Sequence, residues 1–174
     1  MPLIQVTASR GTLGKRDQDI LIKRLSDAVL TAERAPLDDA GAQALVWAHY
    51  HEQPAGTSYV AGAPIEEAPI RIAITTPEGA LDEPARQELA VAVGEIVDDI
   101  VGPFEERLNH WAMLYEVDEG SWAGAGQIFP LSGIQAAMNI KPVHVSYAET
   151  PGNQKQPIST LMQARPPRPP TAHA

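Results

Sequence analysis

Apolar and polar residues alternate along the first part of the chain in a pattern that predicts a strand, a helix and a second strand. Residues 2–8, "PLIQVTA", form a short run rich in β-forming residues. Residues 15–34 carry apolar side chains at helical spacing, and "ALVWAHYHE" at 44–52 is typical of a second strand. The predicted buried face of the helix contains Ile20, Leu21, Leu25, Ala28, Val29 and Ala32.

The same order of elements is predicted further along the chain. "IRIAIT" at 70–75 alternates as a half-buried strand does, and "HWAMLYEV" at 110–117 predicts a closing strand. Between them, Pro84 suits the first turn of a helix, and Gly102 followed by Pro103 marks its end. The predicted apolar stripe of this helix contains Leu89, Val93, Ile96, Val97, Ile100 and Val101.

The two segments are copies of one unit. "WAHYHEQPAGTSYVAG", which begins at Trp47, and "WAMLYEVDEGSWAGAG", which begins at Trp111, share a Trp-Ala pair, a glutamate and a glycine at an offset of 64 residues. "PLIQVT", which begins at Pro2, and "PIRIAIT", which begins at Pro69, are offset by 67. A duplicated supersecondary unit explains both offsets.

The repeat predicts an α/β (α+β) fold made of tandem βαβ units. The first unit spans 2–62 and the second 68–130, within a domain of residues 2–135. Since a βαβ crossover makes its strands parallel and is right-handed, we expect one four-stranded sheet with both helices on one face. The other sheet face needs a cover, and we expect association between copies of the chain to supply it.

Composition excludes several classes of function. A formal net charge of -9 argues against nucleic acid as a partner. The absence of cysteine rules out disulfides and thiolate metal sites. No apolar run approaches the roughly 20 residues that cross a bilayer, and the N-terminus lacks the order of a signal peptide. A soluble cytoplasmic protein without a membrane partner is the default expectation.

The C-terminal extension, residues 136–174, differs from the domain. From Lys141 onward the chain holds seven of the 16 prolines and four of the 13 basic residues, with Glu149 as its single acid. "RPPRPP" favours extended polyproline conformation. The extension is either a surface-draped segment or an arm that binds a neighbouring subunit or partner.

Taken together, Pro2 at the start of a βαβ unit, the "W-A-x-x-x-E" strand and the hairpin "GSWAGAGQ" resemble the tautomerase superfamily, named for 4-oxalocrotonate tautomerase. The duplicated length is similar to the subgroups of cis-3-chloroacrylic acid dehalogenase and malonate semialdehyde decarboxylase, and "EQPAGTSYVAG" is particularly similar to the former. The resemblance covers about residues 2–130. It implies a homotrimer that works without metal or cofactor.

The resemblance gives Pro2 the central role. Initiator methionine is routinely removed before a small residue, which leaves Pro2 with a free secondary amine. A terminal amine has an ordinary pKa of about 7.7 to 8.0, and burial lowers it, so such an amine can act as a base near neutral pH. Pro69 holds the equivalent place in the second unit, but its nitrogen is an amide. Only the first unit therefore offers catalysis.

The chain departs from the family in its arginines, which the family uses to bind the substrate carboxylate. One of them sits five residues before the strand glutamate, where this chain has Trp47 and Trp111. Arg10, just before Gly11, is one candidate replacement, and a solvated loop arginine is the alternative. Arg71 is a second candidate because alternation places it on the helix-free sheet face, where pseudosymmetry also predicts Pro2 to act; the alternative is an intersubunit ion pair.

Aromatic and histidine side chains complete the predicted site. Trp122 and Tyr59 occupy hairpin positions where the family places an aromatic residue against the catalytic proline; simple packing is the alternative. Trp47 would suit a bulky or aromatic substrate. His49 and His51 share a strand face, but two ligands do not make a metal site, so we expect packed histidines, with His49 able to assist proton transfer.

The sequence thus predicts a cofactor-independent tautomerase, a keto-enol isomerase, that acts on a small 2-oxo acid or enol with Pro2 as general base. Two alternatives stay open. The same proline can support a hydratase- or decarboxylase-type reaction on an unsaturated or 3-oxo acid. A non-catalytic trimeric binding protein is the other reading, because several family residues are missing.

Overall fold

A computed structural model describes residues 2–105 and 107–141 of the 174-residue chain. Most of the predicted C-terminal extension lies outside the described residues. Within the described part, no helix is long and apolar enough to cross a membrane.

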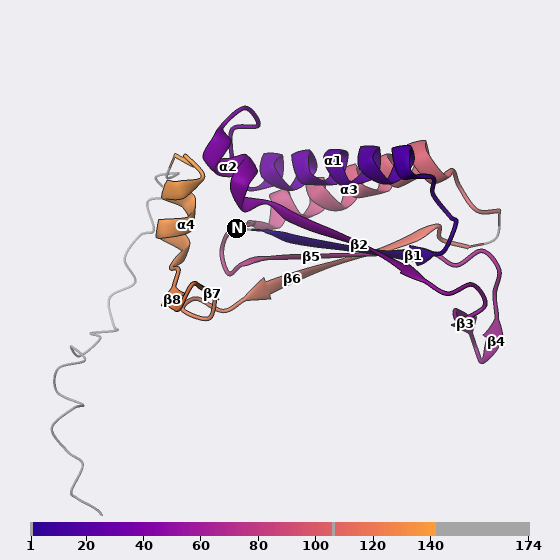
Figure 1. The fold of residues 1–174 in the computed structure, drawn as a ribbon. Helices are drawn as coiled ribbons and strands as arrows, with labels where there is room; N and C mark the ends of the chain where they lie inside the picture. The colour runs from indigo at the N-terminus through magenta and orange to yellow at the C-terminus, as the bar shows by residue number, and fades with distance from the viewer. Residues whose placement is uncertain (1, 106, 142–174) are drawn as a thin grey trace, which may run out of the picture. The chain divides into compact units, whose positions relative to one another are not determined.

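The core of the fold is one four-stranded sheet, as the repeat predicts (Figure 1). Each unit contributes a parallel pair, and the two units meet where β1 and β5 run antiparallel. The spatial order is β2-β1-β5-β6. The strands are β1 (Leu3–Ser9), β2 (Trp47–Gln53), β5 (Ile70–Pro77) and β6 (His110–Val117).

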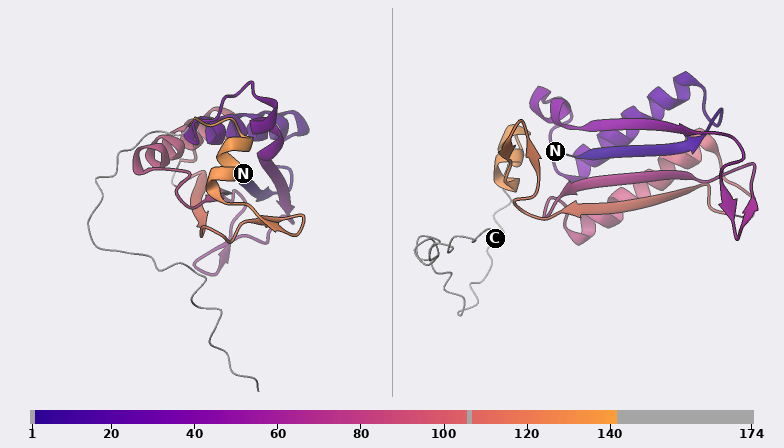
Figure 2. Two further views of the ribbon diagram at one scale, coloured as in Figure 1. Left: turned by 90° about the vertical axis from the view of Figure 1, so that its left-hand side faces the viewer. Right: turned by 60° about the horizontal axis from the view of Figure 1, so that its bottom comes forward.

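Two long helices cover one face of this sheet (Figures 1 and 2). They are α1 (Lys15–Ala32) and α3 (Glu83–Val101). Pro84 lies in the first turn of α3, and Asp82 caps that helix by accepting a hydrogen bond from the backbone N–H of Ala85 at 2.9 Å. The predicted stripes are largely buried, but Ile20 is 38% exposed because it lies at the edge of the buried stripe of α1.

Strict alternation fixes which strand residues meet the helices. Ile4 and Val6 of β1, and Ile72 and Ile74 of β5, are fully buried beneath α1 and α3. Their neighbours in the sequence point to the opposite face, where no helix packs in the described residues. On that helix-free face the edge strands expose large aromatic side chains. They are Trp47, Trp111 and Tyr115.

Each unit ends in a small hairpin. The first consists of β3 (Tyr59–Val60) and β4 (Ala63–Pro64), and the second of β7 (Ala123–Gly124) and β8 (Gln127–Ile128). Both turn through an Ala-Gly pair with positive φ at both residues, the signature of a type I′ turn. The repeat therefore extends to the backbone conformation of the turns.

The two hairpins lie at opposite ends of the sheet (Figures 1 and 2). Because β2 is parallel to β1, the first hairpin follows the far end of β1 and lies beside Pro69 at the start of β5. By the same reasoning, β6 ends at the start of β1, so the second hairpin lies at the Pro2 end. Each proline is thus faced by the hairpin of the other unit.

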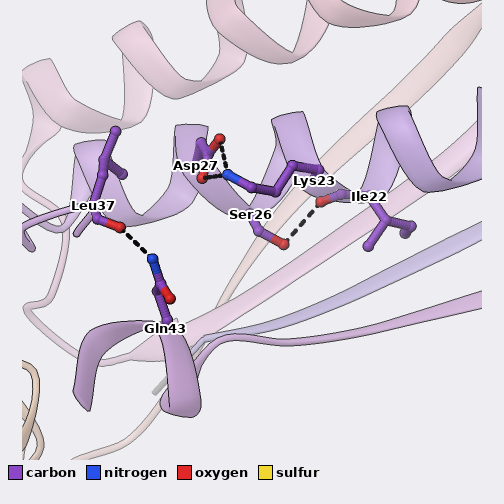
Figure 3. Close-up of polar contacts among 6 residues, drawn as sticks. All are labelled: Ile22, Lys23, Ser26, Asp27, Leu37 and Gln43. Atoms are coloured by element: carbon purple, nitrogen blue, oxygen red, sulfur yellow. Dashed lines mark hydrogen bonds and ion pairs between the residues drawn. The ribbon is translucent and has the colours of Figure 1, made fainter. Parts of the chain in front are cut away.

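Two short helices were not predicted from the sequence. They are α2 (Ala40–Leu45) and α4 (Leu131–Ala137), which pack together over the C-terminal end of α1. Gln43 of α2 holds the preceding loop by donating a hydrogen bond to the backbone oxygen of Leu37 at 2.7 Å, while Lys23 and Asp27 pair on the exposed side of α1 (Figure 3). Because α4 crosses residue 135, the folded part reaches beyond the predicted domain boundary.

A second apolar cluster fixes α4 to the body. Its buried residues are Leu30, Ala35, Ala42, Ile134 and Met138. Asn139 adds a hydrogen bond to Asp39 at 3.5 Å. The segment after the second hairpin is therefore part of the domain rather than of the tail.

The close approach of α2 to α4 gives a testable expectation. A Cβ added at Gly41 would press deep into the backbone oxygen of Ala137, so Gly41→Ala must push α4 away. We expect a loss of about 1–3 kcal/mol in the free energy of unfolding. Urea denaturation measures it.

Gly94 provides the matched control within α3. A Cβ there would meet only the His110 ring at 3.9 Å, an ordinary contact. Gly94→Ala should therefore stabilise the protein by up to about 1 kcal/mol, as helix propensity alone predicts. Equal effects of the two substitutions would contradict the close packing of α4.

Candidate active site

Pro2 lies buried at the start of β1. Its backbone oxygen accepts a hydrogen bond from the N–H of Trp47 at 3.1 Å, which ties it to β2. Pro2 is two residues before the buried Ile4, so the two share the parity that places alternate strand residues on one face. The register pairs Leu3 with Thr75, and continuing it by one residue places Pro2 beside Thr76. By this parity Pro2 continues the helix-covered side of β1. The face on which its amine acts stays a prediction.

A carboxyl group lies on the same side of the sheet end. Glu33 is the C-cap residue of α1 and is only 4% exposed. Neither carboxyl oxygen has a hydrogen-bond partner within the described part of the chain. Burial raises the pKa of the Glu33 carboxyl to about 7, and the positive charge of the chain's amino terminus opposes part of that rise.

The raised pKa links the protonation of Glu33 to stability. Between the ordinary carboxyl pKa of about 4.5 and the raised pKa of about 7, the folded chain keeps a proton on Glu33 that the unfolded chain has lost. Because the folded state then binds more protons than the unfolded state, the free energy of unfolding decreases as pH rises through this window. The stability associated with Glu33 is therefore complete at low pH and lost at higher pH.

Glu33 lines a small cavity that α4 covers. The cavity measures about 10 Å³, which is about the room that one water molecule needs. Besides Glu33, its wall is formed by Pro77, Ala80, Leu131, Ile134, Gln135, Met138 and Ile140. Thr76, next to Pro77, is 1% exposed and its hydroxyl oxygen also lacks a partner among the described residues. Polar atoms without partners thus gather at the Pro2 end.

Two arginines lie at this end, and acids bind both of them. Arg34 pairs with Asp82 at 2.5 Å, which joins the end of α1 to the start of α3. Arg86 pairs with Glu116 of β6 at 2.5 Å. Neither guanidinium is therefore bound to Glu33.

The structure brings two of the predicted site residues to the Pro2 end. Trp122 of the second hairpin is half-buried and packs against the apolar cluster that holds α4. Trp47 lies beside Pro2 because its backbone N–H donates a hydrogen bond to the Pro2 oxygen, but the Trp47 ring is 61% exposed on the helix-free face. Its indole N–H donates to the backbone oxygen of Ala44 at 3.2 Å.

Three further predicted residues lie at the other end of the protomer. Arg10 follows the last residue of β1, Tyr59 lies in the first hairpin, and Arg71 pairs in register with Thr7. Arg71 is exposed on the helix-free face as predicted, yet five positions of a strand, about 17 Å, separate Thr7 from Pro2. The antiparallel join of the two units causes this separation. One protomer does not bring these residues to Pro2.

His49 and His51 are exposed on β2, with stacked rings whose centroids are 6.0 Å apart. His49 is in register with Gln5, three residues from Pro2. In the described segments, no three His, Asp or Glu side chains gather as a metal site requires.

Sequence reasoning missed Glu33 and Thr76. A signal for the former was available: Glu33 follows Val29 by four residues and so continues the apolar stripe of Leu25 and Val29. An acid inside a buried stripe indicates a constrained carboxyl. The burial of Thr76 follows the alternation of β5 in the same way.

Comparison by sequence finds no relatives: no protein-family model matches the chain, and no curated protein matches it. Comparison by structure finds many similar folds. A fused 4-OT, solved as an asymmetric trimer, is 18% identical with a TM-score of 0.61 and covers 72% of this chain and 94% of its own.

Two other structures extend the comparison. Pt0534, solved after inactivation by 2-oxo-3-pentynoate, is 25% identical with a TM-score of 0.60 and covers 72% of this chain and 94% of its own. A member of the cis-3-chloroacrylic acid dehalogenase family is 16% identical with a TM-score of 0.63 and covers 77% of this chain and 87% of its own. The order of elements, the duplicated unit and these similarities agree: the chain has the tautomerase superfamily fold.

Proposed function

We propose that the chain is a cofactor-independent tautomerase, a keto-enol isomerase, that acts on a small 2-oxo acid or its enol. The observation that carries the proposal is the position of Pro2, which is buried at the start of the first unit of this fold. Removal of Met1 gives Pro2 a free amine that serves as general base. Pro69 takes the same position in the second unit but remains an amide, so the chain has one catalytic proline.

The surroundings of Pro2 suit an amine that works near neutral pH. Apolar walls disfavour the charged form of an amine and lower its pKa from about 7.7 to 8.0. The half-buried Trp122 and the apolar cluster that holds α4 lie at the same end of the sheet as Pro2, and we propose that they supply such walls. A base with this pKa removes a proton from carbon adjacent to a carbonyl and returns it after the electrons have shifted to oxygen.

We propose that the protein works as a homotrimer. The helix-free sheet face exposes the large aromatic side chains Trp47, Trp111 and Tyr115 on its two edge strands, and such exposed apolar surface favours burial in an interface. Fused 4-OT structures that resemble the chain are trimers. Association would also bring arginines to the Pro2 site. Within one protomer, Arg10 and Arg71 lie at the far end of the sheet, so a neighbouring subunit has to present them if they bind the substrate carboxylate.

The substrate class rests on two supports. A 2-oxo acid has an enolisable carbon beside its carbonyl, which is the group that a general base at Pro2 can use. Pt0534, which resembles this chain, is inactivated by 2-oxo-3-pentynoate, itself a 2-oxo acid. Trp47 and Trp122 favour a substrate with a bulky or aromatic group.

The proposal is tested in two steps. Intact mass shows whether Met1 is removed, and retention in the purified protein contradicts Pro2 as a base. The processed chain is then mixed with phenylenolpyruvate or 2-hydroxymuconate, and ultraviolet absorbance follows ketonisation. Acceleration over buffer supports the tautomerase. Hydration or decarboxylation products would favour the alternative reactions, and no turnover of any kind a binding protein.

A further inference from the structure

The buried carboxyl of Glu33, which has no role in the function proposed above, is enclosed by α4. Neither of its oxygens has a hydrogen-bond partner in the described part of the chain, and the residue is 4% exposed. Because its cavity has room for about one water molecule, an ionised carboxylate cannot be hydrated there as it is in bulk water. Much of the cavity wall comes from α4 and the residues just after it: Leu131, Ile134, Gln135, Met138 and Ile140.

We propose that Glu33 makes the packing of α4 depend on pH. While the carboxyl is protonated, α4 stays packed on the body of the domain. When the carboxyl ionises, α4 separates from the body and the carboxylate meets water. This inference goes beyond the proposed function and does not depend on it.

Helix α4 can separate while the sheet stays folded. It has seven residues, and the buried cluster that holds it is distinct from the core between the sheet and the two long helices. Ile134 and Met138 are the side chains that this segment buries in the cluster. Pro130, which precedes the helix, offers no side-chain cap. A short element with few buried apolar side chains opens at a lower free energy than the core.

The arginines on the neighbouring helices are bound to other acids. Arg34, the next residue after Glu33, pairs with Asp82, the cap of α3. Arg86 of α3 pairs with Glu116 of β6. The charge of the chain's amino terminus opposes part of the rise in the pKa of Glu33, yet that pKa stays at about 7. An ionised Glu33 in the packed state is therefore poorly compensated.

The other elements around α4 do not neutralise Glu33 either. Helix α4 contains no charged residue, and the buried Thr76 hydroxyl of β5 is neutral. Glu119, after β6, accepts a hydrogen bond from the first backbone N–H of α4 at 3.1 Å, and the charged residue at α2 is its cap, Asp39. After the ends of β5 and α4, and in the first turn of α3, the charged side chains are exposed: Glu78, Lys141 and Glu83.

The direction of the pH effect follows from the two states of the carboxyl. Packed beneath α4, Glu33 has a pKa of about 7, and released into water it returns to the ordinary pKa of about 4.5. Because the packed state binds more protons between these values, the equilibrium shifts toward release as pH rises through this window and levels off above it. The difference of about 2.5 pKa units corresponds to a total shift of about 300-fold.

Release of α4 also affects the second hairpin. Trp122 packs against the cluster that holds α4, and its backbone oxygen accepts a hydrogen bond from the N–H of Phe129 at 2.9 Å, just before the helix. Separation of α4 removes part of the cover of the Trp122 ring. The surroundings of this ring therefore change with pH together with the packing of the helix.

Hydrogen exchange of the full-length chain tests the proposal. NMR follows the amide protons between about pH 5 and about pH 8, and each rate is divided by the intrinsic exchange rate at that pH to give a protection factor. The amide of Met138, which donates to the backbone oxygen of Ile134 at 3.0 Å, reports on α4. The amide of Ile72 in β5 reports on the core.

In the wild type, we expect the protection of the Met138 amide to fall by about 50-fold or more across this pH range. It should stay below that of the Ile72 amide at every pH, because α4 opens before the core. Glu33→Gln keeps the shape of the side chain and removes its ionisation, so the protection of Met138 should become constant. Asp38→Asn is the matched control, since Asp38 is an exposed acid in the loop after α1, and this variant should keep the wild-type pH dependence.

Two results overturn the proposal. A protection of Met138 that is constant in the wild type, or that falls equally in Glu33→Gln, shows that Glu33 does not control α4. Equal protection of Met138 and Ile72 shows that α4 leaves only when the whole domain unfolds.

A second measurement keeps the test decisive if Glu33→Gln does not fold. The Glu33 carboxyl of the wild type is then titrated by ¹³C NMR. A midpoint above the ordinary carboxyl range, together with the fall in Met138 protection, supports the proposal, and a midpoint at an ordinary carboxyl pKa overturns it. Because none of these measurements uses a substrate, their outcome is separate from that of the proposed function.

Discussion

A chain that carries one additional residue before Pro2 is expected to lose ketonisation activity by about 10²- to 10⁴-fold. The extra residue turns the proline nitrogen into an amide, which removes the proposed general base while leaving the ring and the fold in place. Pro2→Ala keeps a primary amine without the ring, so its loss should fall at the lower end of the same range. Initial rates from ultraviolet absorbance at saturating substrate measure both changes.

Pro69 is the control that the duplication provides. It is the counterpart of Pro2 and begins the equivalent strand, but it lies inside the chain, half-buried beside the first hairpin. Pro69→Ala should keep the wild-type rate within about twofold. Loss of activity in Pro69→Ala, or full activity in the extended chain, would show that catalysis does not depend on the Pro2 amine.

Ile72→Ala is expected to have the largest effect on stability, a loss of about 2–5 kcal/mol in the free energy of unfolding. Ile72 is fully buried in β5, between Val6 of β1 and Ala112 of β6, where α1 and α3 cover the sheet. Truncation leaves a cavity among close-packed side chains that cannot collapse into it. Urea unfolding at one fixed protein concentration measures the loss, since the proposed association would also contribute to stability.

Ile20→Ala is the control, because it makes the same chemical change at a partly exposed position. Ile20 is 38% exposed in the protomer, so we expect a change within about 0.5 kcal/mol. Similar losses for the two variants would indicate that Ile20 is buried in an assembly, and a small effect at Ile72 would contradict the packing of the core.

The sequence was sufficient for the features that repeat. Strand alternation, two apolar helical stripes and the offset between Trp47 and Trp111 predicted the sheet, its two covering helices and the order of units. The structure confirms them. Local periodicity predicts these strands and helices because each of them buries one face in the shared core.

Features that depend on the join between units were harder to predict. Alternation correctly placed Arg71 on the helix-free face, but the antiparallel pairing of β1 with β5 puts it far from Pro2 within the protomer. Helix α4 has too few residues to show a helical period, and it forms because Ile134 and Met138 bury against α1 and α2. Glu33 was overlooked because acids at helix ends are usually exposed.

Each proline lies beside the hairpin of the other unit, and this arrangement has a consequence for the evolution of the duplicated chain. The neighbourhood of Pro2 draws on the first strand and helix of one unit and on the last strand and hairpin of the other, so neither unit carries the site alone. The remaining halves of the two units bring Pro69 together with the first hairpin. The Pro69 nitrogen is a peptide amide, so it is not basic. If Pro2 is the catalytic base, selection for catalysis acts on half of each copy and leaves the other half free to change. That other half, with Val60 and Arg107 beside Pro69, is where new binding properties can arise without loss of the activity.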